Sequence, residues 1–421
     1  MIRKVLKIVK WLIIIFIVLL LLLAGGVYLI LHKDSDGYFG ISSVAKSILF
    51  GTSGNVKGAE EKLQGIKKMK NDWREFNFND IKGETPYMVF GTESSPALGK
   101  YFVQDIKIYK NIGFVTGDDR EEVQDKATAE DIGTIKIEQR MKAYVFITKD
   151  NGKTFEKQCF GHGTAIRVAR ANDDFYLTVA QLDTNTGDVY KSEDQGETWK
   201  KVEFRPWAVI NQDIMIARIS PAKITYDGGK TWKKPSLNLQ AYIRTYGKYP
   251  FPEPYKNKLV VLRGRNLIFF NLESDKEEIV PLNVPKGKII DDSTLHSDEE
   301  TGELSLRLFH DVVGNPRLTQ SSIWFPLEDK EVIFDKKLPE TVYLEVHGKY
   351  IGGFTKVEGV LTHIWTLDKG EHWQYELLPN YFWEHKKGYG NGEIWMEAYV
   401  KGKKDLEDGS YLVMCKLKDY E

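Results

Sequence analysis

Four similar stretches place a hydroxyl, a carboxylate, a glycine and an aromatic ring at fixed spacing. They are "TKDNGKTFEKQ", "SEDQGETWKKV", "TYDGGKTWKKP" and "TLDKGEHWQYE". A repeated hydroxyl and carboxylate could be a site of chemistry, or a turn that recurs because the fold recurs. The residues at the four fixed positions are Thr148, Asp150, Gly152 and Phe155; Ser192, Asp194, Gly196 and Trp199; Thr225, Asp227, Gly229 and Trp232; and Thr366, Asp368, Gly370 and Trp373.

The chemistry of this pattern favours the turn. A short Asp side chain accepts hydrogen bonds from backbone N–H groups just after it, and a Ser or Thr hydroxyl binds another backbone group. Glycine suits a position that needs a positive φ angle. The aromatic residue falls where the next strand begins, so we expect it to pack between neighbouring sheets. In the last copy His372 replaces the usual Thr, which predicts the loss of one hydroxyl partner.

The pattern resembles the Asp-box, or BNR repeat, of sialidase-like β-propellers. The resemblance covers roughly residues 142–373, from the first copy to the last. It implies that each box is a structural turn between the two outer strands of a blade. It also implies that a ligand would bind elsewhere, in loops on the opposite face of the propeller.

Sialidases of this fold hold the substrate carboxylate with three arginines, and use a Tyr nucleophile, a Glu and an Asp. Their first arginine lies in a Phe/Tyr-Arg-Ile-Pro motif ahead of the first box, where this chain has "YMVFGTESS". The segment "FRPWA" imitates that motif but lies between the second and third boxes. Arginines that could project inward are Arg167, Arg205, Arg244, Arg263 and Arg307. We therefore expect no catalysis; the alternative is an exo-sialidase-like glycosidase or a glycan-binding protein.

Other chemistries have weaker support. The eight histidines are scattered without an HExxH motif, so no metal site and no cofactor are predicted. Cys159 and His162 are near neighbours, but no third residue that would orient them is identifiable. Cys159 and Cys415 are the only cysteines, and the sequence leaves open whether they pair.

The elements that position these residues are short β-prone runs separated by Gly, Asn, Asp and Pro. Such a pattern is typical of a sandwich, a barrel or a propeller. The boxes recur at about the length of a propeller blade, roughly 40–50 residues. Degenerate turns near Glu273 and Glu328 fill the long gap before Asp368, and "YLVMCKL" supplies a last strand. The sequence thus predicts an all-β propeller, with seven blades favoured and six as the alternative.

A membrane segment is predicted ahead of the propeller. Arg3, Lys4, Lys7 and Lys10 precede the uncharged run Trp11–Leu31, which is long enough to cross a bilayer core of about 30 Å. A cleaved signal peptide is the alternative. The expected organisation is a cytoplasmic tail at 1–10, an anchor at 11–31, a connector with a short helix at 32–84, and the propeller at 85–421. Charge placement predicts a periplasmic or other extracytoplasmic propeller on the plasma membrane.

A protein partner is the expected ligand. The net charge of −1 disfavours a nucleic acid, and propeller loops commonly carry binding residues. The partner would make the protein an assembly or scaffold factor, or an immunity protein that neutralises a toxin. Two aromatic segments are candidate binding loops, and their residues are Tyr246, Tyr249, Phe251 and Tyr255, and Tyr381, Phe382 and Trp383.

Overall fold

The computed structural model describes residues 56–76, 101–119, 142–181, 186–204, 206, 208–217, 222–243, 253–298, 301–310, 322–333, 344–379, 382–400 and 409–418. They belong to one compact unit, which spans Asn55–Gly91 and Pro96–Glu421. The predicted tail and anchor lie outside the described residues. Among the residues that are described, no helix is long and apolar enough to cross a membrane.

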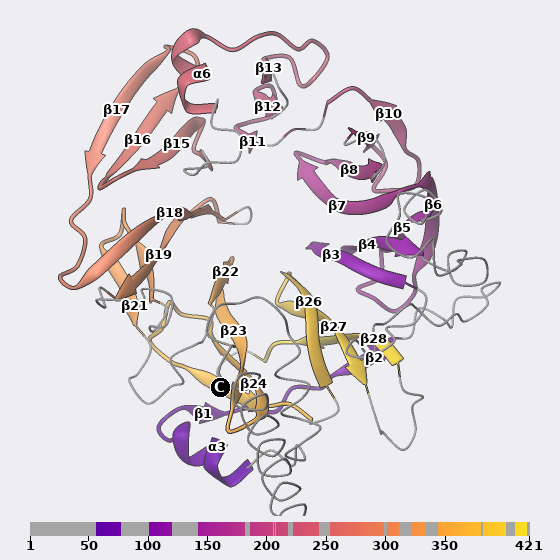
Figure 1. The fold of residues 1–421 in the computed structure, drawn as a ribbon, viewed down its shortest axis with the longest axis vertical. Helices are drawn as coiled ribbons and strands as arrows, with labels where there is room; N and C mark the ends of the chain where they lie inside the picture. Colours follow the sequence, from indigo (N-terminus) through magenta and orange to yellow (C-terminus); the bar gives the residue numbers. More distant parts are fainter. Residues whose placement is uncertain are drawn as a thin grey trace, which may run out of the picture. The chain divides into compact units, whose positions relative to one another are not determined.

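Seven mainly antiparallel sheets are arranged in a ring, which confirms the predicted seven-bladed propeller (Figure 1). We use the word channel for the region along the axis of this ring, bordered by the first strand of each blade. Blade 1 contains β3 (Tyr101–Tyr109), β4 (Ile112–Asp119), β5 (Lys142–Thr148) and β6 (Glu156–His162). Blade 2 contains β7 (Thr164–Ala171), β8 (Asp174–Gln181), β9 (Thr186–Ser192) and β10 (Lys200–Val202), and blade 3 contains β11 (Ala208–Val209), β12 (Met215–Ala217) and β13 (Lys223–Thr225). The helix α6 (Leu237–Ile243) follows blade 3.

The remaining blades follow in chain order. Blade 4 contains β14 (Glu253–Tyr255), β15 (Lys258–Arg263), β16 (Asn266–Asn271) and β17 (Lys276–Pro281). Blade 5 contains β18 (Lys288–Ser297), β19 (Leu304–His310), β20 (Ser322–Phe325) and β21 (Lys330–Ile333). Blade 6 contains β22 (Glu345–His347), β23 (Tyr350–Val357), β24 (Val360–Thr366) and β25 (Gln374–Leu377), and blade 7 contains β26 (Phe382–Gly390), β27 (Glu393–Val400) and β28 (Gly409–Lys416).

The hydrophobic core is divided among the interfaces between blades. Each pair of neighbouring blades shares one cluster of buried apolar side chains. The clusters form because both faces of each sheet are covered, so strands such as β24 are buried along their whole length. The cluster between blades 2 and 3 is small, with Ala171, Tyr176 and Met215 as its buried members.

The two ends of the described chain meet in blade 7. The N-terminal strand β2 (Arg74–Phe76) pairs antiparallel with β28 and forms the outermost strand of that blade. Just before it, β1 (Lys67–Lys68) pairs parallel with β25 and adds a fifth strand to blade 6. The ring is therefore closed by hydrogen bonds between segments from opposite ends of the sequence.

This closure changes the expected role of the segment before residue 85. The sequence assigns residues 67–76 to the connector, whereas the strand pairing makes them part of the propeller. The expected short helix is present as α3 (Val56–Lys62). Gly65 follows the helix with a φ of 90°, a conformation that ends a helix without steric cost.

Candidate functional site in the central channel

The Asp-box turns join the third and fourth strand positions of their blades, and their polar groups bond to one another. In the first copy, Thr148 Oγ1 donates to Asp150 Oδ1 at 2.7 Å and accepts from the Gly152 N–H at 2.9 Å. Asp150 Oδ1 accepts from the N–H groups of Lys153 and Thr154 at 3.1 and 3.0 Å, and Oδ2 accepts from Thr154 Oγ1 at 2.7 Å. The other copies repeat this network from Asp194, Asp227 and Asp368.

Backbone geometry explains the glycine of each copy. Gly152, Gly196, Gly229 and Gly370 have φ angles between 71° and 89°, a range that side chains disfavour. Space is limited as well, because a Cβ on Gly370 would lie 2.5 Å from Val332 of the preceding blade. Glycine therefore serves both the turn and the close approach of two blades.

The fourth copy departs from the expectation for His372. Its imidazole Nδ1 lies 2.6 Å from Asp368 Oδ2, where the other copies place a Thr hydroxyl. The turn has exchanged a hydroxyl for a ring nitrogen, so no hydrogen-bond partner of the aspartate is lost.

The aromatic residue of each copy packs against the preceding blade. Phe155 lies 6.0 Å from Trp395 of blade 7, between ring centroids, and Trp199 lies 6.4 Å from Phe114 of blade 1. Trp232 and Trp373 pack against the clusters between blades 2 and 3 and between blades 5 and 6. Because hydroxyl, carboxylate and ring are all engaged within the turns or between blades, these turns organise the fold.

The ionisable groups that remain gather along the innermost strands. We use the term channel cluster for His296 of β18, Glu345 and His347 of β22, and Lys387 of β26. These strands are the first of blades 5, 6 and 7 and lie nearest the centre of the ring (Figure 1). His296 and His347 lie just before the first hairpin turn of their blades. Because strands alternate in direction, the first and third turns share a face, so the cluster lies at the Asp-box end of the channel.

The members of the channel cluster are close but not tightly bonded. Glu345 Oε2 lies 3.6 Å from His347 Nε2, and Glu345 Oε1 lies 3.9 Å from Lys387 Nζ. The rings of His296 and His347 are 6.3 Å apart, and His347 stacks on Tyr389 at 4.7 Å. The side chains of Glu345 and His347 are 28% and 32% exposed. The cluster therefore offers partly solvated polar groups to a ligand in the channel.

Burial and neighbouring charges shift the titration of these groups. Burial, together with the nearby His347 and Lys107, lowers the pKa of His296 to about 4, although Asp298 and Glu345 oppose this shift. Burial alone would raise the pKa of Glu345, but His347, Lys387 and Arg307 outweigh it and hold that pKa below its usual value. At neutral pH the site therefore combines a neutral imidazole with a carboxylate.

Blades 1 and 2 add charges to the same channel. Burial raises the pKa of Asp105 on β3, although Lys107 and the exposed Arg167 on β7 oppose that rise. Arg167 thus acts on a carboxylate of the neighbouring innermost strand. Together with the channel cluster, these residues place both signs of charge along five of the seven innermost strands.

The predicted binding loops are only partly described. Tyr246, Tyr249, Phe251 and Tyr381 lie outside the described residues. Tyr255 is not in a loop: it ends strand β14, and its ring lies 5.8 Å from Phe269 in the core of blade 4. Phe382 and Trp383 belong to strand β26 rather than to a loop. Pairing with neighbouring strands overrides the local glycine and proline signals that suggested loops.

The arginines that the sequence suggested as inward-facing do not gather at one place in the described residues. Arg307 donates to the backbone carbonyl of Leu344 at 2.6 Å, which ties blade 5 to blade 6, and Arg263 is exposed at the end of β15. Arg205 and Arg244 lie outside the described residues.

Cys159 is exposed on β6 and Cys415 is buried on β28, and both are free thiols. No group of three or more potential metal ligands occurs within the described ranges.

The channel cluster was not predicted from the sequence. Its four members come from three blades, and no repeated local motif contains them. A signal existed at "LEVHG", where Glu345 and His347 alternate with apolar residues on a strand that must be the first of its blade. Recognising it required the blade assignment that only the strand pairing provides.

Proteins similar to this chain are found among solved structures. No family model matches the chain, and no curated protein matches it. Similar solved structures include YCF48 bound to D1 peptide, with 10% identity, a TM-score of 0.43, and coverage of 84% of this chain and 98% of that one. Trypanosoma rangeli sialidase is 12% identical with a TM-score of 0.32, and the match covers 83% of this chain and 60% of the sialidase. A prolyl endopeptidase is 10% identical with a TM-score of 0.42, and the match covers 76% of this chain and 51% of the endopeptidase.

Proposed function

We propose that this chain is a membrane-anchored, extracytoplasmic β-propeller that binds a protein partner at the channel cluster. The observation that carries the proposal is the convergence of partly solvated side chains of both charge signs in the channel, beside turns whose own polar groups are already bonded. Complementary charges across an interface provide specificity and orientation more than raw affinity.

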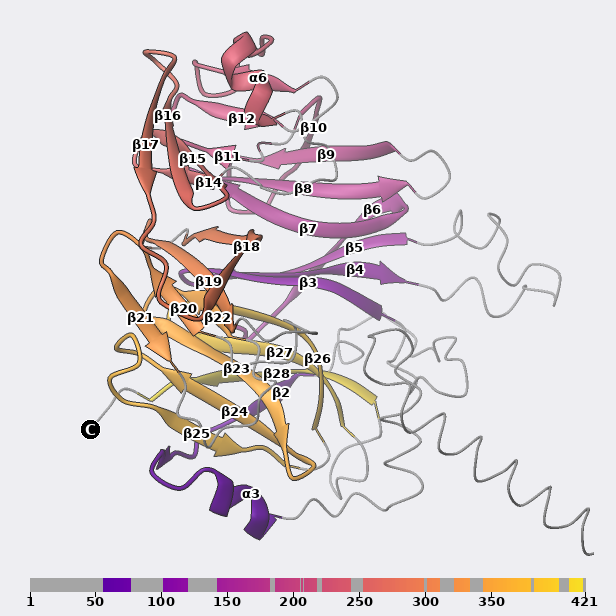
Figure 2. The same cartoon turned by 60° about the vertical axis from the view of Figure 1, so that its left-hand side comes forward.

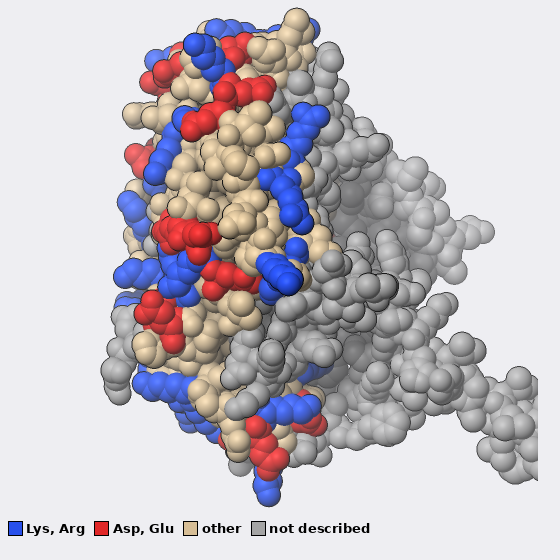
Figure 3. All heavy atoms as spheres, turned by 90° about the vertical axis from the view of Figure 1, so that its left-hand side faces the viewer, with Lys and Arg blue, Asp and Glu red and all other residues tan. Residues whose placement is uncertain are grey.

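The composition of the channel favours recognition of a polypeptide. Glu345 Oε1 lies 3.9 Å from Lys387 Nζ, and that ammonium also lies 5.4 Å from the centroid of the Phe354 ring, so both signs of charge meet at this point. Arg167 is exposed one blade away from Asp105. On the side of the molecule shown in Figure 3, basic and acidic side chains are interspersed. A protein surface with its own mixture of charges suits such a site better than a polyanion does.

The location rests on the N-terminal sequence. Basic residues before Trp11–Leu31 would keep the N-terminus in the cytoplasm and place the propeller on the opposite side of the membrane. The biological role is then that of an assembly or scaffold factor, or of an immunity protein against a toxin. The genes that flank this one would distinguish these two roles.

Site-specific photocrosslinking in the full-length protein tests the proposal. A p-benzoylphenylalanine replaces Arg167 at the channel, and a second protein carries it at Ile279, which is 60% exposed on the outermost strand of blade 4. We expect a discrete crosslinked protein from the Arg167 position alone. Lys387→Gln should reduce its yield several-fold without changing the melting temperature. Equal crosslinking from both positions, or indifference to Lys387→Gln, would contradict the proposal.

The rival glycosidase is tested on the same protein. Sialosides and other glycosides should show no turnover with the full-length chain. Turnover that disappears when Arg167 or Arg307 is replaced by Ala would replace protein binding with a glycan-active function.

A further inference from the structure

Residues 56–76 form a continuous segment along the outer rim of four blades, which we call the N-terminal clasp. Ala59 of helix α3 and Leu63, the residue after that helix, are buried in the cluster between blades 5 and 6. Strand β1 then extends blade 6, and strand β2 completes blade 7. In Figure 2, α3 and β1 follow the outer edge of blade 6 beside β25.

The clasp ends against the first Asp-box turn of blade 1. Arg74 donates from Nη2 to the carbonyl of Asn151 at 3.2 Å. The ring of Phe76 lies 4.7 Å from that of Phe155. A segment of about twenty residues therefore contacts blades 5, 6, 7 and 1, which includes the position where the ring closes.

One buried carboxylate holds the middle of the clasp. Glu376 of β25 accepts from the Asn71 N–H and side-chain amide at 2.8 Å each, and from Trp73 Nε1 at 3.2 Å. Asn71 Oδ1 accepts from the Lys418 N–H, just after β28, at 3.4 Å. Asn71 and Glu376 are 3% and 5% exposed. Hydrogen bonds to a charged acceptor are the stronger kind, and removing one partner leaves buried groups unsatisfied.

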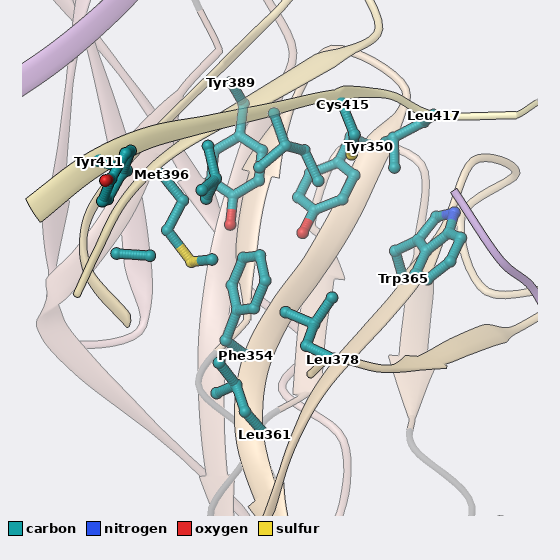
Figure 4. Close-up of a cluster of buried hydrophobic side chains, with 13 residues drawn as sticks. Tyr350, Phe354, Leu361, Trp365, Leu378, Tyr389, Met396, Tyr411, Cys415 and Leu417 are labelled. Carbon is teal, nitrogen blue, oxygen red and sulfur yellow. The ribbon is translucent and has the colours of Figure 1, made fainter. Parts of the chain in front are cut away.

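The same interface connects Glu376 with the channel. His363 lies directly opposite Glu376 in the pairing of β24 with β25. Its Nε2 lies 3.0 Å from the hydroxyl of Tyr350, which stacks on Tyr389 at 4.4 Å. Tyr389 in turn stacks on His347 of the channel cluster. Figure 4 shows Tyr350 and Tyr389 side by side in this interface, above Phe354.

We propose that the N-terminal clasp regulates the channel cluster: when it is seated on Glu376 it keeps blades 6 and 7 closed and His347 stacked on Tyr389, and its release loosens that stack. This inference rests on the proposed function for its biological use, because it assumes that the channel cluster is the binding site. The clasp leads toward the proposed anchor in sequence, so events at the membrane could reach the channel through it.

The test uses the full-length protein with Glu376→Gln. The amide keeps the size of the side chain but places an N–H₂ group against the donors of Asn71 and Trp73. Glu371→Gln is the matched control, because Glu371 belongs to the same blade and its side chain is 66% exposed. Two quantities are measured: hydrogen exchange of the amides at 67–76, and the rate at which diethylpyrocarbonate modifies His347, determined by mass spectrometry.

We expect Glu376→Gln to increase exchange in the clasp at least ten-fold and His347 modification several-fold, with the control unchanged. Trp73→Phe removes a single donor and should move both quantities in the same direction by less, so it carries the test if Glu376→Gln does not fold. Faster exchange with unaltered His347 modification would overturn the regulation, and no change in either quantity would overturn the clasp itself. Neither measurement needs a partner, so failure of the crosslinking experiment would refute the proposed function separately.

Discussion

At the scale of single residues, the same amino acid types have different roles according to their surroundings. Asp150 forms hydrogen bonds only within its turn, whereas Asp105 lies among charges from two innermost strands. Burial opposes the ionisation of Asp150, but bonds from Thr154, Thr148 and Lys153 outweigh it and hold its pKa at about 2. Burial raises the pKa of Asp105 instead. The first residue stabilises a turn, and the second lies near the charges of Lys107 and Arg167.

Asp150→Ala should destabilise the propeller by about 1–2 kcal/mol, because four hydrogen bonds to the carboxylate are lost in a partly exposed turn. Equilibrium denaturation in urea measures the change. Asp173→Ala is the control, since that side chain is 100% exposed. Equal stability of the two variants would mean that the Asp150 bonds contribute nothing measurable.

His296 should make stability depend on pH. Its pKa in the folded state is about 4, below the ordinary value of 6.5, so the unfolded chain binds a proton first as the pH falls. The contribution of the neutral ring is complete above about pH 6.5 and declines toward pH 4. Melting temperatures of the full-length protein across this range should fall less steeply for His296→Gln than for the wild type. Parallel pH profiles would refute this prediction.

At the scale of elements, stability depends on how closely neighbouring blades approach. Gly113 of β4 faces Trp395 of β27 across the interface between blades 1 and 7, and a Cβ at Gly113 would lie 2.1 Å from the indole ring. Gly388 and Gly390 serve the same interface, since a Cβ at either position would approach the carbonyl oxygens of Ile106 and Ile108 within 2.5 Å. The last blade thus fits the first through positions without side chains.

Gly113→Ala should destabilise the protein by about 1–3 kcal/mol through overpacking. Trp395→Phe makes room at this contact, so the double variant should be more stable than the sum of the single changes by about 0.5–3 kcal/mol. A double-mutant cycle from urea denaturation measures this coupling. Strict additivity would show that the indole ring does not limit the space at Gly113.

The local features were predictable from the sequence, and the long-range ones were not. Each Asp-box turn closes within a few residues, so its pattern appears directly in the chain. The blade number followed because the turns recur at blade length. Asn71 and Glu376, by contrast, are 305 residues apart in sequence, and His296 meets His347 only through the ring. Strand order sets such contacts, and no local pattern records it.

At the scale of the whole molecule, both proposals concern how the propeller is connected to the membrane and to a partner. The described residues form a ring of seven blades, and the clasp precedes the first of these blades in sequence.

Deletion of residues 1–31 should release the protein from the membrane fraction while the propeller stays folded, because the clasp begins only after residue 55. Fractionation of cells that express the full-length and shortened chains, with circular dichroism of the soluble product, measures both effects. A shortened chain that still sediments with membranes would contradict the proposed anchor.

The pairing of β2 with β28 also determines when the protein can become complete. Strand β2 is synthesised more than 300 residues before its partner β28, so it stays unpaired while the other blades are made. Contacts of such long sequence separation form slowly and leave strand edges open to wrong partners in the meantime. Nascent chains that stop before residue 409 lack β28, so blade 7 cannot be completed in them. Synthesis of β28 is thus the step that allows blade 7 to be completed.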